Sequence, residues 1–295
     1  MPALILDKEA LLRVCPLEKD IESYPEGIII PVDKPYRWTS ADVVRKLKWA
    51  ACTHFGKRNL KVGHAGTLDP LATGVLLLCI GKATKLAEDL QRSPKEYIAG
   101  LSFGATTPSY DLEKEIDRTF STEGVSEGAL RSALVTFLGE QEQVAPLFSA
   151  KSIDGVRAYE MARTQYKKSL SEGRAFSHEG EELLSRQRIT ISGIELLSYS
   201  PQGIPASQNP AIGAGEETNE KNLRIKVQDI SSLSLPHARI RVACSKGTYI
   251  RALARDIGEA VGSGAFLDSL QRSASGSFRV EKALSVDEAM WALGR

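Results

Sequence analysis

The chain has 295 residues, which is enough for one large domain or two ordinary ones. Hydrophobic residues make up 42% and charged residues 25%, which excludes a disordered or fibrous chain and is typical of a globular protein. No segment approaches the roughly 20 apolar residues needed to span a bilayer. The N-terminus also lacks the basic start and apolar core of a secretory signal, so we expect a cytoplasmic protein without a membrane partner.

Strands and helices are predicted to alternate irregularly along the chain, after an extension at 1–26 with a short helical pattern. Apolar runs predict strands at 28–32, 75–80, 97–103, 185–200, 223–230, 238–244 and 278–280. Helices are predicted at 41–51 with Ser40 as N-cap, 84–91, 126–138, 156–164, 248–261 and behind a capping box at 285–288. This order indicates an α+β fold with a large mixed or antiparallel sheet flanked by helices.

We expect the extension to be followed by one domain over residues 27–295. Residues 201–222 are rich in Gly, Pro, Ser, Asn and Glu, and residues 165–184 form a second polar stretch of the same kind. Both are expected to be exposed insertions. No separate C-terminal domain is expected, because the sequence stops soon after the last predicted helix.

The net charge of +1 conceals two basic segments. Residues 37–61 carry seven bases and one acid, and residues 239–255 carry five bases and no acid. Such segments suit a phosphate backbone, but on charge alone they are more simply explained as solvated surface.

Neither the cysteines nor the histidines are spaced like metal ligands, and no C-x-x-C pair occurs. We therefore expect reduced thiols, with Cys79 and Cys244 buried in apolar strands, and no metal site. No phosphate-binding glycine motif is present either, so no cofactor is expected.

The most informative stretch is G-H-A-G-T-L-D-P-L-A-T-G at 63–74, which leads directly into the apolar strand at Val75. Pro70 biases Asp69 toward an extended backbone, and the glycines permit tight turns. A carboxylate held on such a loop can act as a nucleophile or a general base. An isolated Asp-Pro pair would be an ordinary turn.

This stretch, followed by G-K-A-T-K at 81–85, closely resembles the signature of the TruB family of tRNA pseudouridine-55 synthases. Five further motifs resemble the same family in the same order, and the resemblance extends over about residues 27–291. They are D-K-P at 33–35, K-E-Y at 95–97, S-A-K at 149–151 with G-V-R-A-Y-E-M-A-R at 155–163, C-S-K-G-T-Y-I-R at 244–251, and L-Q-R at 270–272.

The resemblance implies a pseudouridine synthase fold with a central RNA-binding cleft. It also implies an isomerase that converts uridine 55 in the T-arm of tRNA without a cofactor. Asp69 would attack the flipped nucleotide, at either the ribose C1′ or the uracil C6. Tyr97 would stack on the base and is a candidate for handling the C5 proton late in the reaction. Arg251 would pair with Asp69 and keep it ionised.

The same resemblance suggests roles for other side chains. Tyr249 would contact the target nucleotide, Leu270 would pack against the base, and His64 would fill the vacated stacking space or touch the RNA beside it. Candidates for phosphate contacts or active-site support are Lys34, Lys151 and Arg163. Each has a structural alternative, such as a half-buried sheet tyrosine, a core leucine or a surface ion pair. The expected partner is the tRNA stem-loop, with no obligate protein partner, and a monomer is expected because no exposed apolar pattern stands out.

The sequence departs from the family in two places. The family loop T-D-T-x-D-x-x-G reads T-T-P-S-Y-D-L-E at 106–113, where only Asp111 keeps an acid in register. Many family members also continue into a small C-terminal RNA-binding domain, so we expect this chain to bind minimal RNA more weakly. Two alternatives remain: an RNA-guided pseudouridine synthase, and a tRNA chaperone that keeps the fold but does not need catalysis.

Overall fold

The computed structural model describes residues 2–149, 151–153, 155–174, 176–178, 181, 184–203 and 225–295. The chain forms two compact units, one made of Met1–Tyr97 and Gln271–Arg295 and the other of Ile98–Leu270. Strands β5 (Lys95–Phe103) and β13 (Ala265–Ser275) each begin in one unit and end in the other.

The first unit is built on strand β4 (Ala72–Ile80), in which every side chain from Val75 onward is buried. Strand β2 (Ile28–Lys34) pairs antiparallel with β4, and β3 (Val62–Ala65) also pairs antiparallel with it. The extension joins this unit through β1 (Leu4–Ile5), which lies parallel to β2. The buried apolar run in β4 confirms the central strand predicted from sequence.

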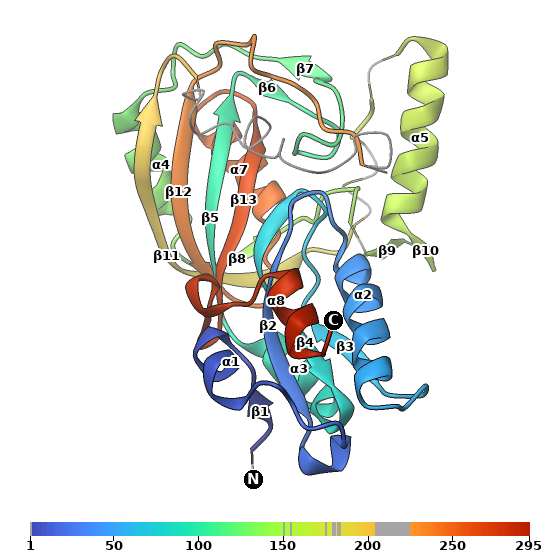
Figure 1. Cartoon of the computed structure of the whole chain (residues 1–295). Helices are drawn as coiled ribbons and strands as arrows, with labels where there is room; N and C mark the ends of the chain where they lie inside the picture. The colour runs from blue at the N-terminus through green and yellow to red at the C-terminus, as the bar shows by residue number, and fades with distance from the viewer. Residues whose placement is uncertain are drawn as a thin grey trace. The chain divides into compact units, whose positions relative to one another are not determined.

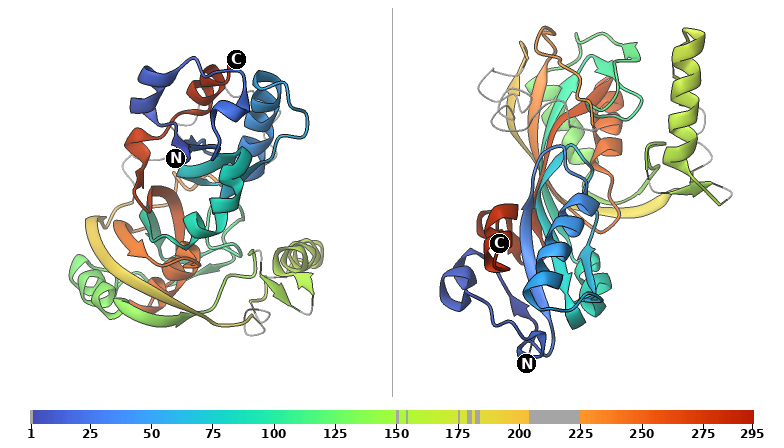
Figure 2. Two further views of the ribbon diagram at one scale, coloured as in Figure 1. Left: turned by 90° about the horizontal axis from the view of Figure 1, so that it is seen from below. Right: turned by 45° about the vertical axis from the view of Figure 1, so that its right-hand side comes forward.

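Helices cover these strands on both sides of β2 (Figures 1 and 2). They are α1 (Lys8–Val14), η1 (Ile21–Ser23), α2 (Ser40–His54), η2 (Gly81–Leu86), α3 (Ala87–Arg92), η6 (Val280–Lys282) and α8 (Val286–Ala292). The predicted capping box at Ser285 is confirmed. The predicted cap of α2 is wrong by one residue: Thr39 forms the capping box with Asp42, and Ser40 begins the helix. Strand β14 (Phe278–Arg279) pairs with β13.

The second unit holds a set of strands covered on one face by helices α4 (Glu127–Thr136) and α7 (Ile250–Ala260), which contact each other (Figure 1). Its strands, besides β5 and β13, are β6 (Ala105–Thr106), β7 (Arg118–Thr119), β8 (Gly139–Gln143), β9 (Ser152–Ile153), β10 (Val156–Arg157), β11 (Gln187–Ser200) and β12 (His237–Cys244). Its helices include α4 (Glu127–Thr136), α5 (Ala158–Glu172) and α7 (Ile250–Ala260).

Hydrogen bonding orders the main sheet as β1-β2-β4-β13-β5-β12-β11-β8, with β3 added on β4 and β14 on β13. Strand β1 lies parallel to β2, whereas the pairs β2 with β4, β3 with β4, β11 with β12, β8 with β11 and β13 with β14 are antiparallel, so the sheet is mixed. The predicted α+β class with a large mixed sheet is therefore confirmed. Four of its strands, β1, β3, β8 and β13, were not predicted, because their sequences are short or largely polar and lack a long apolar run.

Two predictions in the second unit need correction. The helix expected at 156–164 runs as α5 to Glu172, because no Gly or Pro interrupts it and Tyr166 packs on the same apolar cluster as Ala162. The first part of the expected insertion 165–184 is therefore helical. Residues 225–230 form no strand, although a strand was expected at 223–230. Most of the other expected insertion, 201–222, lies outside the described residues.

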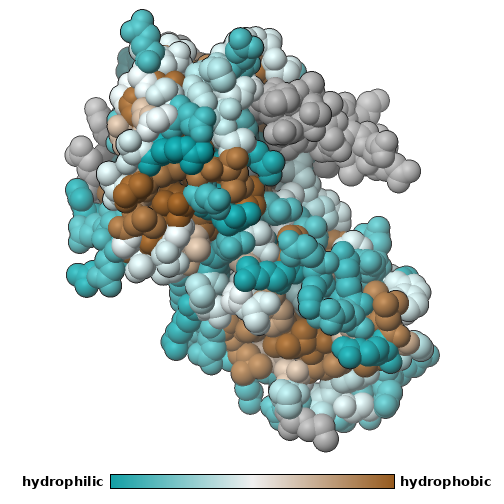
Figure 3. Space-filling view, turned by 90° about the vertical axis from the view of Figure 1, so that its left-hand side faces the viewer, coloured by the Kyte–Doolittle hydropathy of each residue, from teal (hydrophilic) through white to brown (hydrophobic). Residues whose placement is uncertain are grey.

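The described surface carries several exposed apolar side chains, including Leu12 (87% exposed), Val135 (65%) and Trp291 (59%). Figure 3 shows apolar side chains gathered in places on one face of each unit. A monomer was expected because the sequence showed no exposed apolar pattern. The structure does expose apolar side chains, so that reason does not hold and the monomer stays a prediction.

Among the described helices, none has the length and apolarity to cross a membrane. All four cysteines are free, and Cys79 and Cys244 are buried as expected.

Candidate active site

Asp69 lies half-buried on the loop between β3 and β4, and hydrogen bonds fix the backbone around it. The Ser40 hydroxyl accepts a bond from the Leu68 N–H (2.9 Å) and donates one to the Leu68 carbonyl (3.2 Å). On the other side, the Ala72 N–H donates to the Asp69 carbonyl (3.1 Å). Helix α2 thus holds the loop immediately before Asp69, and a short turn holds it immediately after.

Arg272 ties the same loop to the sheet, and sequence reasoning did not select it. Its side chain is 1% exposed, and its guanidinium donates to the carbonyls of Val75 (2.7 Å), Gly66 (3.0 Å) and Thr67 (3.4 Å). Gly74 permits this approach: a Cβ there would lie 2.3 Å from the Arg272 carbonyl oxygen, and Gly74 has a φ of +98°. The L-Q-R motif contained the signal, but the strand that aims Arg272 inward was not predicted.

Lys34 is fully buried at the end of β2, and its expected role in phosphate contact or active-site support stays a prediction. Its ammonium donates to the carbonyls of Trp38 (2.6 Å), Pro35 (2.9 Å) and Pro70 (3.1 Å). Burial lowers the pKa of Lys34 to about 7, and the negative charge of Asp69 opposes that shift. The Lys34 side chain therefore anchors Pro70, the residue that follows Asp69.

The other two candidates of the first unit are aromatic. His64 is half-buried on β3, and its pKa is lowered by burial and then by the charge of Arg272. Its imidazole is accordingly neutral at neutral pH, which suits a stacking surface. Its Nδ1 atom is buried and has no hydrogen-bond partner among the described residues. Tyr97 lies on β5 with 9% of its surface exposed.

In the second unit, Arg251 occupies the first turn of α7 and is 6% exposed. Its guanidinium donates to the carbonyls of Ser109 (3.1 Å) and Phe148 (3.0 Å), and its Nε lies 3.8 Å from Asp111 Oδ2. Two loops distant in sequence therefore hold the Arg251 side chain.

Asp111 lies buried beside this guanidinium. In the loop at 106–113 it is the residue that keeps an acid in register with the family motif. It accepts hydrogen bonds from the Ser109 hydroxyl (2.6 Å) and the Glu113 N–H (2.9 Å). Burial raises its pKa to about 6, although Arg251 and the hydrogen bonds act in the opposite direction. At 3.8 Å the ion pair is too long to offset the loss of water.

Tyr249 is the N-cap residue of α7, and Gln143 holds its backbone at both polar atoms. The Gln143 amide accepts from the Tyr249 N–H (2.8 Å) and donates to its carbonyl (3.1 Å). The Tyr249 ring packs on the cluster that includes Phe148 and Phe176. Gln143 was missed because a buried glutamine on a polar strand gives no local signal.

The remaining candidates also lie in the second unit. Leu270 is half-buried on β13, and Lys151 is half-buried before β9. Arg163 is exposed on α5, with its guanidinium 5.3 Å from the centre of the Tyr159 ring. The structure thus places four of the predicted side chains in the first unit and five in the second. Contacts of Lys151 and Arg163 with RNA stay predictions.

A buried charged network supports the loop that carries Asp111. His178 lies between two carboxylates, with Nε2 2.8 Å from Asp117 and Nδ1 3.2 Å from Glu181. Glu181 also pairs with Arg255 of α7 (2.8 Å), and the Tyr110 hydroxyl lies 3.1 Å from His178 Nδ1. Burial lowers the pKa of His178, but its hydrogen bonds to Asp117 and Glu181 outweigh burial and raise it overall.

This network predicts a pH-dependent stability. The pKa of His178 is raised in the folded protein, so the charged imidazole stabilises the fold fully below its unfolded pKa of about 6.5. That stabilisation is lost as pH rises through the pKa of the folded protein. The free energy of unfolding should therefore fall on the order of 1 kcal/mol more in wild type than in His178→Gln as pH rises above about 6.5. Urea unfolding at several pH values measures this, and parallel profiles for the two proteins would contradict it.

Among the described residues, no group of three or more His, Cys, Asp or Glu side chains is arranged to hold a metal ion. In the first unit the candidate side chains are instead the loop carboxylate of Asp69, the buried cations of Lys34 and Arg272, and the rings of His64 and Tyr97. Such a set can supply a nucleophile or base, charge stabilisation and stacking surfaces for a flat ring.

Comparison with known proteins defines the class to which this fold and site belong. Residues 53–209 match the family model described as TruB family pseudouridylate synthase, N-terminal domain. The class is therefore that of the pseudouridylate synthases. The chain belongs to the TruB family.

Relatives named tRNA pseudouridine synthase B are similar over most of this chain. The protein from Phocaeicola vulgatus is 44% identical over 266 residues, which covers 90% of this chain and 92% of that protein. The protein from Bacteroides thetaiotaomicron is 44% identical over 263 residues, covering 89% and 91%. The protein from Thermus thermophilus is 37% identical over 258 residues, covering 87% and 75%.

Solved structures agree with this fold. A Cbf5–Nop10–Gar1 complex contains a chain that is 25% identical, with a TM-score of 0.52 over 90% of this chain. An H/ACA RNP bound to a substrate RNA containing 2′-deoxyuridine contains one that is 23% identical, with a TM-score of 0.51 over 89% of this chain. This chain spans about half the length of those chains, 53% and 51%. The expected pseudouridine synthase fold is confirmed.

Proposed function

We propose that this protein is a tRNA pseudouridine synthase that isomerises uridine 55 in the T-arm. Family membership and the name shared by the relatives at 37–44% identity support a tRNA substrate. The observation that carries the chemistry is the loop of Asp69, which Ser40, Arg272 and Lys34 hold from three other elements. A carboxylate positioned this firmly suits a reaction that needs one well-aimed nucleophile.

The bond changes of the reaction require one positioned carboxylate and a route for one proton. The uracil N1–C1′ bond breaks, the base turns, and a C5–C1′ bond forms while the C5 proton leaves and N1 gains a proton. Asp69 would begin this by attack on C1′ or on C6. Because the base is not released to water, the reaction needs no second carboxylate to activate water, unlike glycoside hydrolysis.

The target base must leave its stack before Asp69 can reach it, at a cost of a few kcal/mol. In this proposal the Tyr97 ring receives the base, and the neutral His64 ring fills the space that it leaves. Tyr249 and Leu270 complete the contacts with the nucleotide in a central cleft, and Arg251 pairs with Asp69. The buried position of Arg251 at the start of α7 supports an electrostatic role, because a desolvated guanidinium acts strongly on a nearby carboxylate.

The RNA-guided alternative is less well supported. The H/ACA structures resemble this chain at 23–25% identity and are about twice as long, whereas relatives named for tRNA are 44% identical over nearly equal lengths. A tRNA substrate also agrees with the expected cytoplasmic location.

The test is to incubate the purified protein with a tRNA transcript tritiated at uracil C5. We expect release of one tritium per tRNA and a pseudouridine at position 55, and no release from a transcript with cytidine at that position. Product in the absence of any guide RNA separates this proposal from the guided alternative. Tight tRNA binding with no tritium release would favour the chaperone instead.

A further inference from the structure

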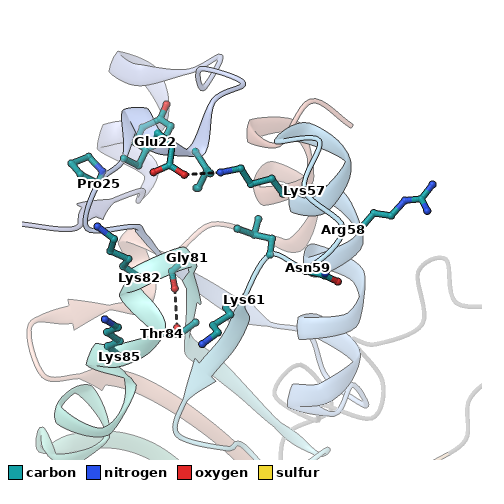
Figure 4. A pocket seen from close by; sticks show the side chains of 13 residues that line it. Glu22, Pro25, Lys57, Arg58, Asn59, Lys61, Gly81, Lys82, Thr84 and Lys85 are labelled. Carbon is teal, nitrogen blue, oxygen red and sulfur yellow. Dashed lines mark hydrogen bonds and ion pairs between the residues drawn. The ribbon is translucent and has the colours of Figure 1, made fainter.

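A basic pocket lies in the first unit, and none of the residues assigned above to the reaction lines it. The cavity has a volume of about 540 Å³ and opens between the extension, the loop after α2, and η2 (Figure 4). Its lining includes five basic side chains, Lys57, Arg58, Lys61, Lys82 and Lys85, and one acid, Glu22. This excess of positive charge needs an explanation, because the chain as a whole is nearly neutral.

Three of these lysines are available to an anion. Lys57 is paired with Glu22 at 2.6 Å, and Figure 4 shows Arg58 directed away from the cavity. Lys61, Lys82 and Lys85 are exposed, and within the described part of the chain none of them has a carboxylate partner. In Figure 4 they surround Gly81 and Thr84 on one side of the pocket.

The floor of the pocket is built before any ligand arrives. Ile21 and Leu60 are each 7% exposed, and Tyr24 meets Phe55 edge-on at 6.2 Å. The Gly81 N–H donates to the Lys61 carbonyl (2.8 Å), which joins η2 to the start of β3. Gly27 packs so closely that a Cβ there would lie 2.3 Å from the Ile80 carbonyl oxygen. Binding of a ligand would therefore cost little free energy for ordering the backbone of this site.

The pocket and Asp69 lie at opposite ends of strand β4. Asp69 precedes the strand and Gly81 follows it, so the nine residues of β4 separate them by roughly 30 Å. That distance corresponds to on the order of nine base pairs of duplex. A hairpin with a very short stem could then reach Asp69 without reaching the pocket, whereas a whole tRNA could reach both.

We propose that this pocket binds the phosphate backbone of the substrate tRNA away from the target uridine, with Lys61, Lys82 and Lys85 as its ligands. The inference rests on the proposed function, which supplies RNA as the substrate. It gives the extension a role, because Ile21, Glu22, Tyr24 and Pro25 line the pocket. Exposed ammonium groups on flexible stems suit phosphates, which need charge more than fixed geometry.

The experiment compares two double variants with the same change in charge. Lys82→Glu with Lys85→Glu alters the pocket, and Arg13→Glu with Lys19→Glu alters exposed bases in the same unit that do not line it. For the pocket variant we expect the Kd and KM for full-length tRNA to rise about tenfold with kcat within twofold of wild type. The slope of log K against log salt should fall by about 2. The control should change Kd less than threefold, and circular dichroism checks that both variants fold.

Two further comparisons test whether the pocket binds RNA remote from the target uridine and whether it binds a small free anion instead. A T-loop hairpin with a three-base-pair stem should react equally well with wild type and the pocket variant. Equal losses on hairpin and tRNA, or equal effects of the two double variants, would overturn the inference. Binding of inorganic phosphate or ATP that Lys82→Glu with Lys85→Glu abolishes, while tRNA binding is unchanged, would instead identify a small-anion site. Failure of wild type to release tritium would refute the proposed function alone, because the Kd comparison does not depend on turnover.

Discussion

Asp69→Asn should lower kcat for tritium release by at least about 10⁴-fold while changing the Kd for tRNA less than threefold. Asparagine has nearly the same shape as aspartate, but it carries no charge and is a very poor nucleophile. The loop should keep its form, because Ser40 and Arg272 bind backbone carbonyl and N–H groups rather than the Asp69 side chain. Single-turnover kinetics with excess enzyme and a filter-binding Kd measure the two quantities separately.

Asp89→Asn provides the matched control for this variant. Asp89 lies in the same unit on α3, with a side chain that is 75% exposed and 3.4 Å from Arg92. It should keep wild-type activity within twofold, because an exposed pair of this kind contributes little. Activity in Asp69→Asn above a hundredth of the wild-type rate would mean that another group begins the reaction.

Arg272→Ala should reduce both stability and turnover. The change leaves the carbonyls of Val75, Gly66 and Thr67 without their buried donor and removes a side chain that is 1% exposed. Loss of about 3 kcal/mol in the free energy of unfolding is expected, with a fall in Tm of roughly 6–12 °C. Because the loop before Asp69 would move, kcat should fall about 100-fold with little change in KM.

Two comparisons separate positioning from a general loss of stability. Arg272→Lys keeps one charged donor and should recover part of kcat, measured well below the Tm of each variant. Arg279→Ala removes a half-exposed arginine of the same unit, 3.7 Å from Glu96, and should cost less than about 0.5 kcal/mol. If Arg272→Ala lowered Tm but kept wild-type kcat, Arg272 would be a purely structural residue.

Much of the fold could be predicted because the signals were local. The run from Val75 to Ile80 has to be buried, and the Ser285 capping box is complete within four residues. Strand β13 lacked such a signal: its polar residues Asp268 and Arg272 are buried only because distant groups receive them. Ser40 was wrongly predicted to cap α2 for a related reason. The Ser40 hydroxyl bonds the backbone of Leu68, 28 residues away, and Thr39 is the cap instead.

The sequence by itself determined the α+β class, the family and the position of Asp69, because a long ordered motif and strong apolar runs are visible without neighbours. Only the tertiary structure decided what holds that carboxylate. Lys34 and Arg272 reach the loop from strands 36 and about 200 residues away, and Asp111 meets Arg251 from another loop. The physical reason is that a buried cation is tolerable only where carbonyls or carboxylates converge on it. Such convergence exists in three dimensions and leaves no pattern along the chain.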